Sequence, residues 1–284
     1  MAEKNSGKCF LVGAGPGDLG LVTLRAKELI ERAEVVVYDY LCNPEMLKWA
    51  PESAEKIYAG KKAGEHTLTQ DEINDLLVAK TREGKQVVRL KGGDPFLFGR
   101  GGEEALALAR ASLAFEIVPG VTSAIAGPAY AGIPVTHREV ASQVTFFTGH
   151  EDPSKSESAI DFATLAKLGG TRVMLMGVER IGAIASELIA NGVPPQTPVG
   201  LIRWATTARQ QTLTGTLENV AQRVAAERFE APAVAVIGEV VRLRDELNWF
   251  EGKPLAGKRI VVTRTRAQAS ELSGRLLSLG ADVL

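Results

Sequence analysis

A glycine-rich stretch in the first half of the sequence has the residue types of a ligand-binding loop. It runs from Val87 to Glu104 and reads Val-Val-Arg-Leu-Lys-Gly-Gly-Asp-Pro-Phe-Leu-Phe-Gly-Arg-Gly-Gly-Glu-Glu. Its first residues, rich in valine and leucine, predict a short strand that stops at Asp94-Pro95. The glycines that follow have no Cβ, so the backbone there can approach a ligand closely. Because a plain surface turn rarely combines five glycines, an aspartate and two aromatic residues, we predict a ligand-binding loop at the end of this strand.

Ionisable side chains occur near the ends of the predicted strands. Carboxylates stand at Asp39 and Asp94, and cations stand at Lys61, Lys62, Arg89, Lys91, Arg100 and Arg138. Backbone amides, a carboxylate and small residues suit a cofactor that has an amino-acid end, a ribose and a base. The cations could pair with carboxylates of a substrate.

Other chemistries fit the sequence poorly. The run Gly13-Ala-Gly-Pro-Gly-Asp18 has Asp18 where a dinucleotide-binding loop needs its third glycine, and Pro16 lacks an amide that a pyrophosphate would use. No Ser-His-Asp or Cys-His arrangement is visible, and the histidines at 66, 137 and 150 have no metal-ligand spacing. These patterns argue against dinucleotide binding, hydrolysis and zinc chemistry.

The first part of the chain predicts strands that alternate with helices. The strands are expected at Cys9–Val12, Glu34–Tyr38, from Ile57, from Val87 and at Phe115–Val118. Thr69 and Glu72 form a Thr-x-x-Glu capping box, which predicts a helix that runs to about Glu83. Strands separated by helix-length segments indicate a mostly parallel sheet with helices on its faces, whose ligands bind at the carboxyl ends of the strands.

A second unit is expected to begin near Pro119-Gly120 with a helix rich in alanine and glycine. Further strands are predicted at Gln143–Phe147, Arg172–Met176, Val199–Arg203 and Ala233–Ile237, with helices at Ile181–Ala190 and Leu217–Ala226. After residue 250 a linker leads to one strand (residues 259–264) and one helix (residues 269–279), which cannot bury a core alone. The predicted domains are therefore residues 8–118, residues 119–250, and residues 251–284 as a linker with the start of a third domain.

Composition favours a soluble cytoplasmic protein. The 284 residues suit two domains. Lys and Arg number 33 and Asp and Glu 34, a net charge of -1, which argues against a general nucleic-acid or membrane surface. The two cysteines are far apart and fit reduced cytosolic thiols. An apolar signal region is absent from the first residues, and no stretch reaches the roughly 18 apolar residues of a membrane span.

Several blocks of the sequence together resemble the tetrapyrrole methylases. They are residues 13–18, Tyr38-Asp39, residues 89–104, Val118-Pro-Gly-Val-Thr122 and Ala131-Gly-Ile-Pro-Val-Thr-His-Arg138. The resemblance covers about Lys8 to Phe250 in matching order and is strongest to family members that methylate uroporphyrinogen III. The tail from Gly257 resembles, over a shorter length, the start of uroporphyrinogen-III synthase.

This resemblance implies an α/β, two-domain tetrapyrrole methylase fold, of the class III S-adenosylmethionine-dependent methyltransferases, with the active site in the interdomain cleft of a homodimer. It implies two successive methyl transfers from S-adenosyl-L-methionine, which becomes S-adenosyl-L-homocysteine. Uroporphyrinogen III would be converted through precorrin-1 to precorrin-2, toward sirohaem or cobalamin. Because the sulfonium is the electrophile, orientation in a closed cleft suffices and no metal is required. A proton must also leave the macrocycle, which gives an ionisable side chain a role.

The resemblance also assigns residues. The methyl donor would contact Pro16, Gly92, Gly93, Asp94, Leu97, Thr122, Ser123, Met176 and Ala205. Asp39 matches the position of a proton acceptor and Lys61 that of a proton donor, while Arg89, Lys91, Arg100 and Arg138 are candidates for binding substrate carboxylates. Two departures from the family pattern occur: Ala205 stands where glycine is usual, and Arg203-Trp204 replaces a more acidic and polar pair.

Alternatives remain at both the residue and the protein level. Asp94 could form only an Asx turn, Asp39 could orient substrate without transferring a proton, and Met176 could be core packing. The chain could instead methylate a later corrinoid, ribosomal RNA or diphthamide, although its near-neutral charge argues against RNA. It could also be a regulatory module that binds an adenosyl ligand without catalysis.

Overall fold

The computed structural model describes residues 7–60, 68–150, 160–263 and 266–284. The chain divides into two compact units, Met1–Thr122 and Ser123–Leu284. Each unit has its own sheet and its own hydrophobic core.

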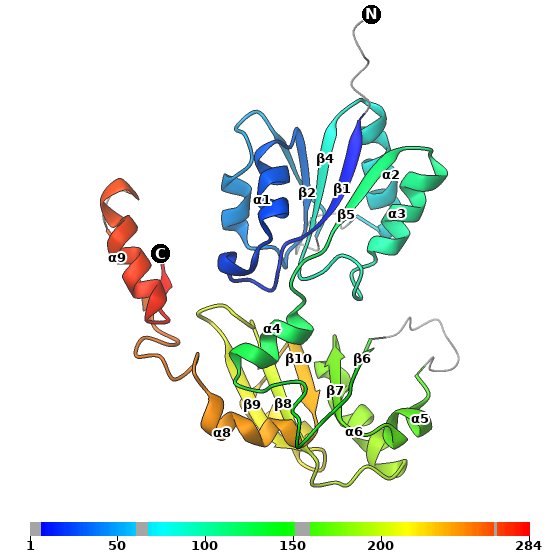
Figure 1. The fold of residues 1–284 in the computed structure, drawn as a ribbon, viewed down its shortest axis with the longest axis vertical. Helices are drawn as coiled ribbons and strands as arrows, with labels where there is room; N and C mark the ends of the chain where they lie inside the picture. The colour runs from blue at the N-terminus through cyan, green and yellow to red at the C-terminus, as the bar shows by residue number, and fades with distance from the viewer. Residues whose placement is uncertain (1–6, 61–67, 151–159, 264–265) are drawn as a thin grey trace, which may run out of the picture. The chain divides into compact units, whose positions relative to one another are not determined.

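The first unit is built on a five-stranded parallel sheet with the strand order β3-β2-β4-β1-β5 (Figure 1). The strands are β1 (Lys8–Gly13), β2 (Val35–Tyr38), β3 (Glu55–Tyr58), β4 (Gln86–Lys91) and β5 (Ala114–Val118). Every neighbouring pair in this sheet is parallel. The predicted parallel sheet is therefore confirmed for this unit.

Helices cover both faces of this sheet (Figure 1). Helix α1 (Leu24–Glu31) lies on one face, and α2 (Gln70–Arg82) and α3 (Gly101–Arg110) lie on the other. Because successive strand residues point to opposite faces, Val88 packs in the core under α1 while Val87 packs in the core under α2 and α3. The predicted capping box is present at the start of α2, with both of its hydrogen bonds made.

The second unit contains a mixed sheet with the order β6-β7-β10-β8-β9. Its strands are β6 (Val144–Thr148), β7 (Thr171–Leu175), β8 (Pro198–Arg203), β9 (Gln211–Thr216) and β10 (Ala233–Ile237). Strands β6 and β7 are parallel, and the other pairs are antiparallel. Since β7 and β8 both run antiparallel to the β10 strand between them, their carboxyl ends lie at the same edge of the sheet.

The helices of this unit are α4 (Ser123–Tyr130), α5 (Phe162–Lys167), α6 (Ile181–Ala190), α7 (Val220–Glu227) and α8 (Arg244–Leu247). Helix α5 and strand β9 were not predicted from the sequence. Strand β9 reads Gln-Thr-Leu-Thr-Gly-Thr, which is polar and has an interior glycine, so a strand there is not apparent from propensity alone.

The tail forms a small parallel pair, β11 (Arg259–Ile260) and β12 (Asp282–Val283), with helix α9 (Arg266–Ser278) between them in sequence. Strand β11 is shorter than predicted. None of the helices in the part of the chain that the structure describes is long and apolar enough to cross a bilayer.

Candidate active site

One edge of the parallel sheet brings together many of the predicted site residues of the first unit. Because all five strands point the same way, the segments after β1, β2, β4 and β5 meet at this carboxyl edge. The predicted residues that follow these strands are Pro16, Asp39, Gly92, Gly93, Asp94 and Thr122. Parallel α/β sheets bind their ligands at such an edge.

Three glycines pack against one another at this edge, and we call Gly13, Gly93 and Gly120 the glycine junction. A Cβ on Gly120 would lie 2.3 Å from the Gly93 carbonyl oxygen and 2.7 Å from the Gly13 Cα. Gly93 has φ 67°, in the left-handed region that favours glycine. Its amide donates to the Gly15 carbonyl at 2.7 Å, so that amide is already used within the protein. The junction therefore needs glycine for close backbone packing.

Asp94 fixes the loop after β4 with three hydrogen bonds. Its Oδ1 accepts from the amides of Phe96 and Leu97, at 2.8 and 3.1 Å. Its Oδ2 accepts from the Gly120 amide at 3.0 Å, which ties the loop to the segment after β5. The Asx-turn geometry is thus present. The predicted contact between Asp94 and the methyl donor remains a prediction.

The rest of this loop holds non-glycine residues in unusual backbone conformations. Phe98 has φ 53° and Arg100 has φ 59°, both left-handed. Such conformations cluster at ligand-binding sites, where the surrounding structure holds them in place.

The Arg100 guanidinium is exposed and forms a bidentate pair with Glu103 at 2.7 and 2.6 Å, which raises the pKa of Arg100.

Asp39 follows β2 and is held from two sides. Its Oδ1 accepts from the Leu41 amide at 3.0 Å, and the Cys42 thiol donates to the same oxygen at 3.5 Å. Its Oδ2 lies 3.6 Å from the Nη2 nitrogen of Arg89, and the Asp39 side chain keeps 23% of its surface exposed. An oriented, partly exposed carboxylate can accept a proton or orient a substrate. Lys61, the predicted proton donor, lies outside the described residues.

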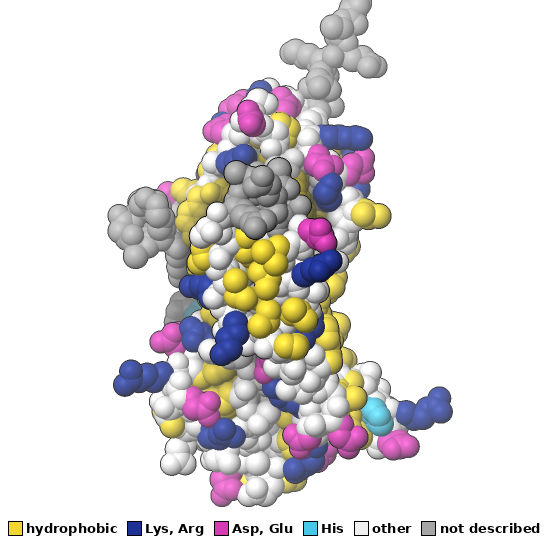
Figure 2. Space-filling model, turned by 90° about the vertical axis from the view of Figure 1, so that its left-hand side faces the viewer, with side chains coloured by type: hydrophobic (Ala, Val, Ile, Leu, Met, Phe, Trp, Pro, Cys, Tyr) yellow, Lys and Arg dark blue, Asp and Glu magenta, His cyan; other side chains and the backbone are white. Residues whose placement is uncertain are grey.

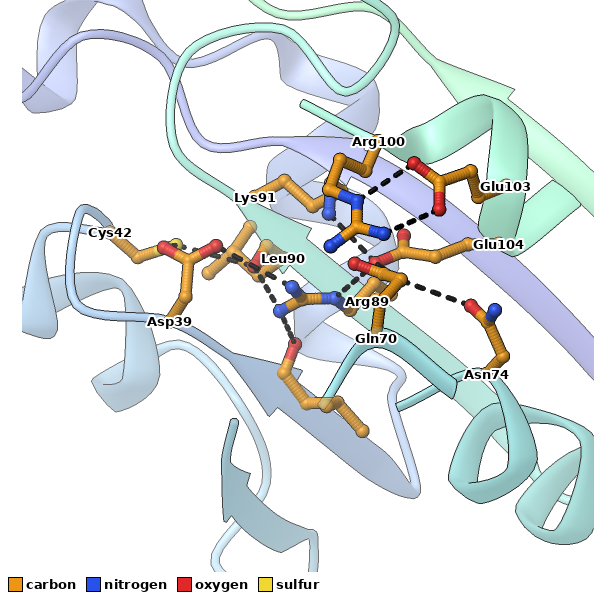
Figure 3. Close-up of polar contacts among 11 residues, drawn as sticks. Asp39, Cys42, Gln70, Asn74, Arg89, Leu90, Lys91, Arg100, Glu103 and Glu104 are labelled. Atoms are coloured by element: carbon orange, nitrogen blue, oxygen red, sulfur yellow. Dashed lines mark hydrogen bonds and ion pairs between the residues drawn. The ribbon is translucent and has the colours of Figure 1, made fainter. Parts of the chain in front are cut away.

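Arg89 and Lys91 form a buried ion cluster with Glu104 (Figure 3). The two cations are two residues apart on β4 and so point to the same face, where they are 3% and 4% exposed. Burial, followed by the positive charge of Arg89, lowers the pKa of Lys91. The prediction that these cations bind substrate carboxylates stays a prediction, and in this structure both contact Glu104.

The burial of Glu104 and its ion pairs with Arg89 and Lys91 were not predicted from the sequence. Its place in the first turn of α3 indicates only a favourable interaction with the helix terminus. The structure buries it completely. A signal did exist, because two cations at alternate positions of a predicted buried strand require a nearby anion.

The second unit carries the remaining predicted residues. Met176 follows β7 with φ 55° and is 51% exposed, unlike a core-packing methionine. Ala205 follows β8, is 7% exposed, and stands between Trp204 and Thr206, both with positive φ. Met176 and Ala205 therefore lie at the same edge of the second sheet. Ser123 begins α4, and Arg138 is exposed in the segment between α4 and β6.

Comparisons with known proteins place these features in a family. The sequence model described as tetrapyrrole (corrin/porphyrin) methylases matches residues 8–221. The chain is 58% identical over 243 residues to a Methanosarcina barkeri protein described as an S-adenosyl-L-methionine-dependent uroporphyrinogen III methyltransferase. This match covers 86% of the chain and 95% of the Methanosarcina protein. It is 44% identical over 284 residues to the Bacillus subtilis uroporphyrinogen-III C-methyltransferase, covering 100% of the chain but only 58% of that relative.

A solved structure is similar over the same region. It is the Thermus thermophilus uroporphyrin-III C-methyl transferase complexed with S-adenyl homocysteine, with a TM-score of 0.71 and 41% sequence identity. The match covers 84% of this chain and 100% of the Thermus chain. The family model matches most of the chain, and the Methanosarcina relative matches it along nearly its whole length. The chain therefore belongs to the tetrapyrrole (corrin/porphyrin) methylases.

Proposed function

We propose that this protein is an S-adenosylmethionine-dependent uroporphyrinogen-III C-methyltransferase, which adds two methyl groups to give precorrin-2 through precorrin-1. The observation that carries the proposal is the 58% identity over 95% of the Methanosarcina barkeri methyltransferase. The carboxyl edge of the first sheet supports it, because a glycine-lined loop there lies beside an oriented carboxylate, Asp39.

The residues at this edge fit a donor of this kind. A Cβ on Gly92 would lie 2.5 Å from the Leu41 Cβ, so only glycine lets the end of β4 pack this closely against the segment after β2, which carries Asp39. When bound, S-adenosylmethionine supplies a sulfonium methyl group, which forms a bond to a pyrrole carbon as its bond to sulfur breaks and S-adenosylhomocysteine leaves. We propose that the donor is held by Pro16, Gly92, Gly93, Asp94, Leu97, Thr122, Ser123, Met176 and Ala205.

The ionisable residues would serve the tetrapyrrole. Asp39 accepts the proton that the macrocycle loses or orients the substrate, since its side chain is partly exposed and its Oδ2 lies beside Arg89. Arg100 and Arg138 are exposed and suit the carboxylates of the substrate. Lys61 would be the proton donor.

The finer features of the proposal rest on the family resemblance. They are a cleft between the two α/β domains as the active site, a homodimer, a cytoplasmic location, the domains 8–118, 119–250 and 251–284, and a tail that resembles uroporphyrinogen-III synthase. A small-molecule substrate also suits the surface in Figure 2, where acidic and basic side chains are interspersed over the face drawn. RNA binding would favour a basic patch.

A comparison of substrates tests this proposal. The protein is incubated with S-adenosylmethionine and, separately, with uroporphyrinogen III and with a later corrinoid, and the products are identified by mass spectrometry. We expect precorrin-2 from uroporphyrinogen III only. Methylation of the corrinoid alone would assign the protein to another step of the family, and donor binding with no methyl transfer to either compound would indicate a non-catalytic module.

A further inference from the structure

Glu104 is a fully buried carboxylate that none of the donor or substrate assignments uses. Its Oε1 accepts from the Lys91 Nζ at 2.8 Å and from the Arg89 Nε at 3.1 Å (Figure 3). Gln70 donates to the same oxygen at a longer 3.4 Å. The other oxygen, Oε2, is buried and has no hydrogen-bond partner among the described residues. One carboxylate oxygen thus binds two cations, while the second is unsatisfied by any residue that the structure describes.

A buried ion cluster of this kind contributes little to the stability of the folded protein. Removing charges from water is costly, and a buried ion cluster often contributes no more than apolar side chains of the same volume would. An unsatisfied buried oxygen adds to that cost. The cluster therefore indicates that Glu104 holds one of the two cations in a particular position. The contacts of Arg89 indicate that this cation is Arg89.

Arg89 spans the distance between Glu104 and Asp39. Its Nε faces Glu104, while its Nη1 donates to the carbonyl oxygens of Leu90 at 3.2 Å and Val37 at 3.5 Å. Its Nη2 lies 3.6 Å from the Asp39 Oδ2. Because the guanidinium is planar, holding its Nε side at Glu104 fixes the direction in which its Nη2 side points.

We propose that Glu104 is a positioning residue for methyl transfer: it holds Arg89 so that the Nη2 side stays beside Asp39 and keeps the Asp39 carboxylate aimed at the macrocycle. This inference rests on the proposed function. Glu104 itself touches neither the methyl donor nor the tetrapyrrole. Without the Glu104 charge, the Leu90 and Val37 carbonyl oxygens are the neutral partners that still hold Arg89. The guanidinium can then shift toward Asp39 and form a closer pair with it, which moves the carboxylate from its working position.

The test uses Glu104→Gln, which removes the charge and keeps the shape. We expect the kcat of methylation to fall about tenfold to a hundredfold, the scale of a misplaced reacting group. The Kd of S-adenosylhomocysteine, measured by calorimetry, should stay within about threefold, because no donor contact is lost.

Glu116→Gln is the matched control. Glu116 also binds two cations, Lys8 at 2.7 Å and Arg25 at 3.0 Å, and it lies on β5 of the same sheet. It has no contact with Asp39 among those that the described residues make. Both kcat and the Kd of S-adenosylhomocysteine should stay at wild-type values in this control.

Two further readouts separate positioning from general damage. In an Arg89→Gln background, Glu104→Gln should cause no additional loss of kcat, because residues that act through one another are not additive. A crystal structure of Glu104→Gln should show the Arg89 Nη2 displaced relative to the Asp39 Oδ2. If Glu104→Gln no longer binds S-adenosylhomocysteine, the same measurements are made with Glu104→Asp. This variant keeps the negative charge but places the carboxylate one methylene further from Arg89.

The outcomes distinguish this inference from the proposed function. If the wild type is active and Glu104→Gln has the same kcat, the positioning role alone is overturned. The same holds if the losses of kcat caused by Glu104→Gln and Arg89→Gln add up in the double variant. A wild-type protein that makes no methylated product from uroporphyrinogen III would overturn the proposed function, and the positioning role with it.

Discussion

Asp94 makes three hydrogen bonds, and two of its variants separate their contributions. Asp94→Ala loses all three hydrogen bonds. Asp94→Asn keeps a side-chain oxygen that accepts from the backbone N–H groups of Phe96 and Leu97, but its NH2 group faces the Gly120 N–H and cannot accept from it. Each lost bond to the charged group is worth about 1.5–3 kcal/mol. We expect Asp94→Ala to weaken S-adenosylhomocysteine binding by tenfold or more and Asp94→Asn to have an intermediate effect, as measured by calorimetry. Unchanged donor binding and methylation in Asp94→Ala would remove the loop from its proposed role.

The buried thiol of Cys9 predicts a pH dependence of stability. Burial, followed by the negative charge of Glu104, raises its pKa from 9.0 to about 12. The unfolded thiol therefore ionises above pH 9.0 while the folded thiol stays protonated. The stability that this group contributes is complete below pH 9.0 and is lost as the pH rises toward about 12, by about 1.4 kcal/mol per pH unit.

Urea titrations of the wild type and of Cys9→Ala, at about pH 7 and about pH 10.5, check this expectation. The free energy of unfolding of the wild type should fall more steeply with pH than that of the variant. Parallel losses in the two proteins would show that Cys9 does not titrate as argued.

At the residue scale, the sequence predicted positions better than partners. The Asp94-Pro95 pair after a valine-rich strand indicated a loop, and a loop was found. The partner of Asp94, Gly120, lies 26 residues further along the chain, and no local pattern links the two. The ion cluster of Arg89 and Glu104 was missed for the same reason, because burial depends on the packing of α3 against the sheet.

At the scale of elements, the glycine junction makes a sharp prediction. Gly120→Ala would place a Cβ within 2.3 Å of the Gly93 carbonyl oxygen, so the segments after β4 and β5 must separate. We expect a loss of about 1–3 kcal/mol in the free energy of unfolding, together with weaker S-adenosylhomocysteine binding. Urea titration and calorimetry measure the two effects.

Gly102→Ala is the control for this variant. A Cβ at Gly102, in the first turn of α3, would meet no atom within 4 Å apart from its chain neighbours and the backbone of its own helix. Because alanine is the better helix former, this variant should be neutral or more stable by up to about 1 kcal/mol. Equal effects of the two substitutions would show that the close approach at Gly120 does not matter.

The two sheets were not equally predictable from sequence. In the first sheet, β1, β2 and β4 are largely buried and contain short apolar runs. Because these strands and β5 alternate with helix-length segments, all four were located closely. The second sheet is mixed, and its β9 strand is polar and only partly buried. Its pairing with β8 is a tertiary outcome that single-sequence propensity does not encode.

At the scale of the whole molecule, the family was predictable because its motifs occur in order along most of the chain. The matched region, residues 8–221, includes the loops at the carboxyl edge of the first sheet and also Met176 and Ala205 of the second unit. Single glycine motifs would not have been sufficient, since Gly13–Asp18 by itself resembles an imperfect dinucleotide loop. The proposed donor residues thus come from both units.

The most direct test of the central claim follows the transferred group. The full chain is incubated with uroporphyrinogen III and with S-adenosylmethionine that carries a trideuterated methyl group, and the tetrapyrrole is examined over time by mass spectrometry. The account predicts a product with one labelled methyl group that is replaced by a product with two, with one S-adenosylhomocysteine released for each transfer. A tetrapyrrole that gains no label, while the chain binds the donor, would contradict it.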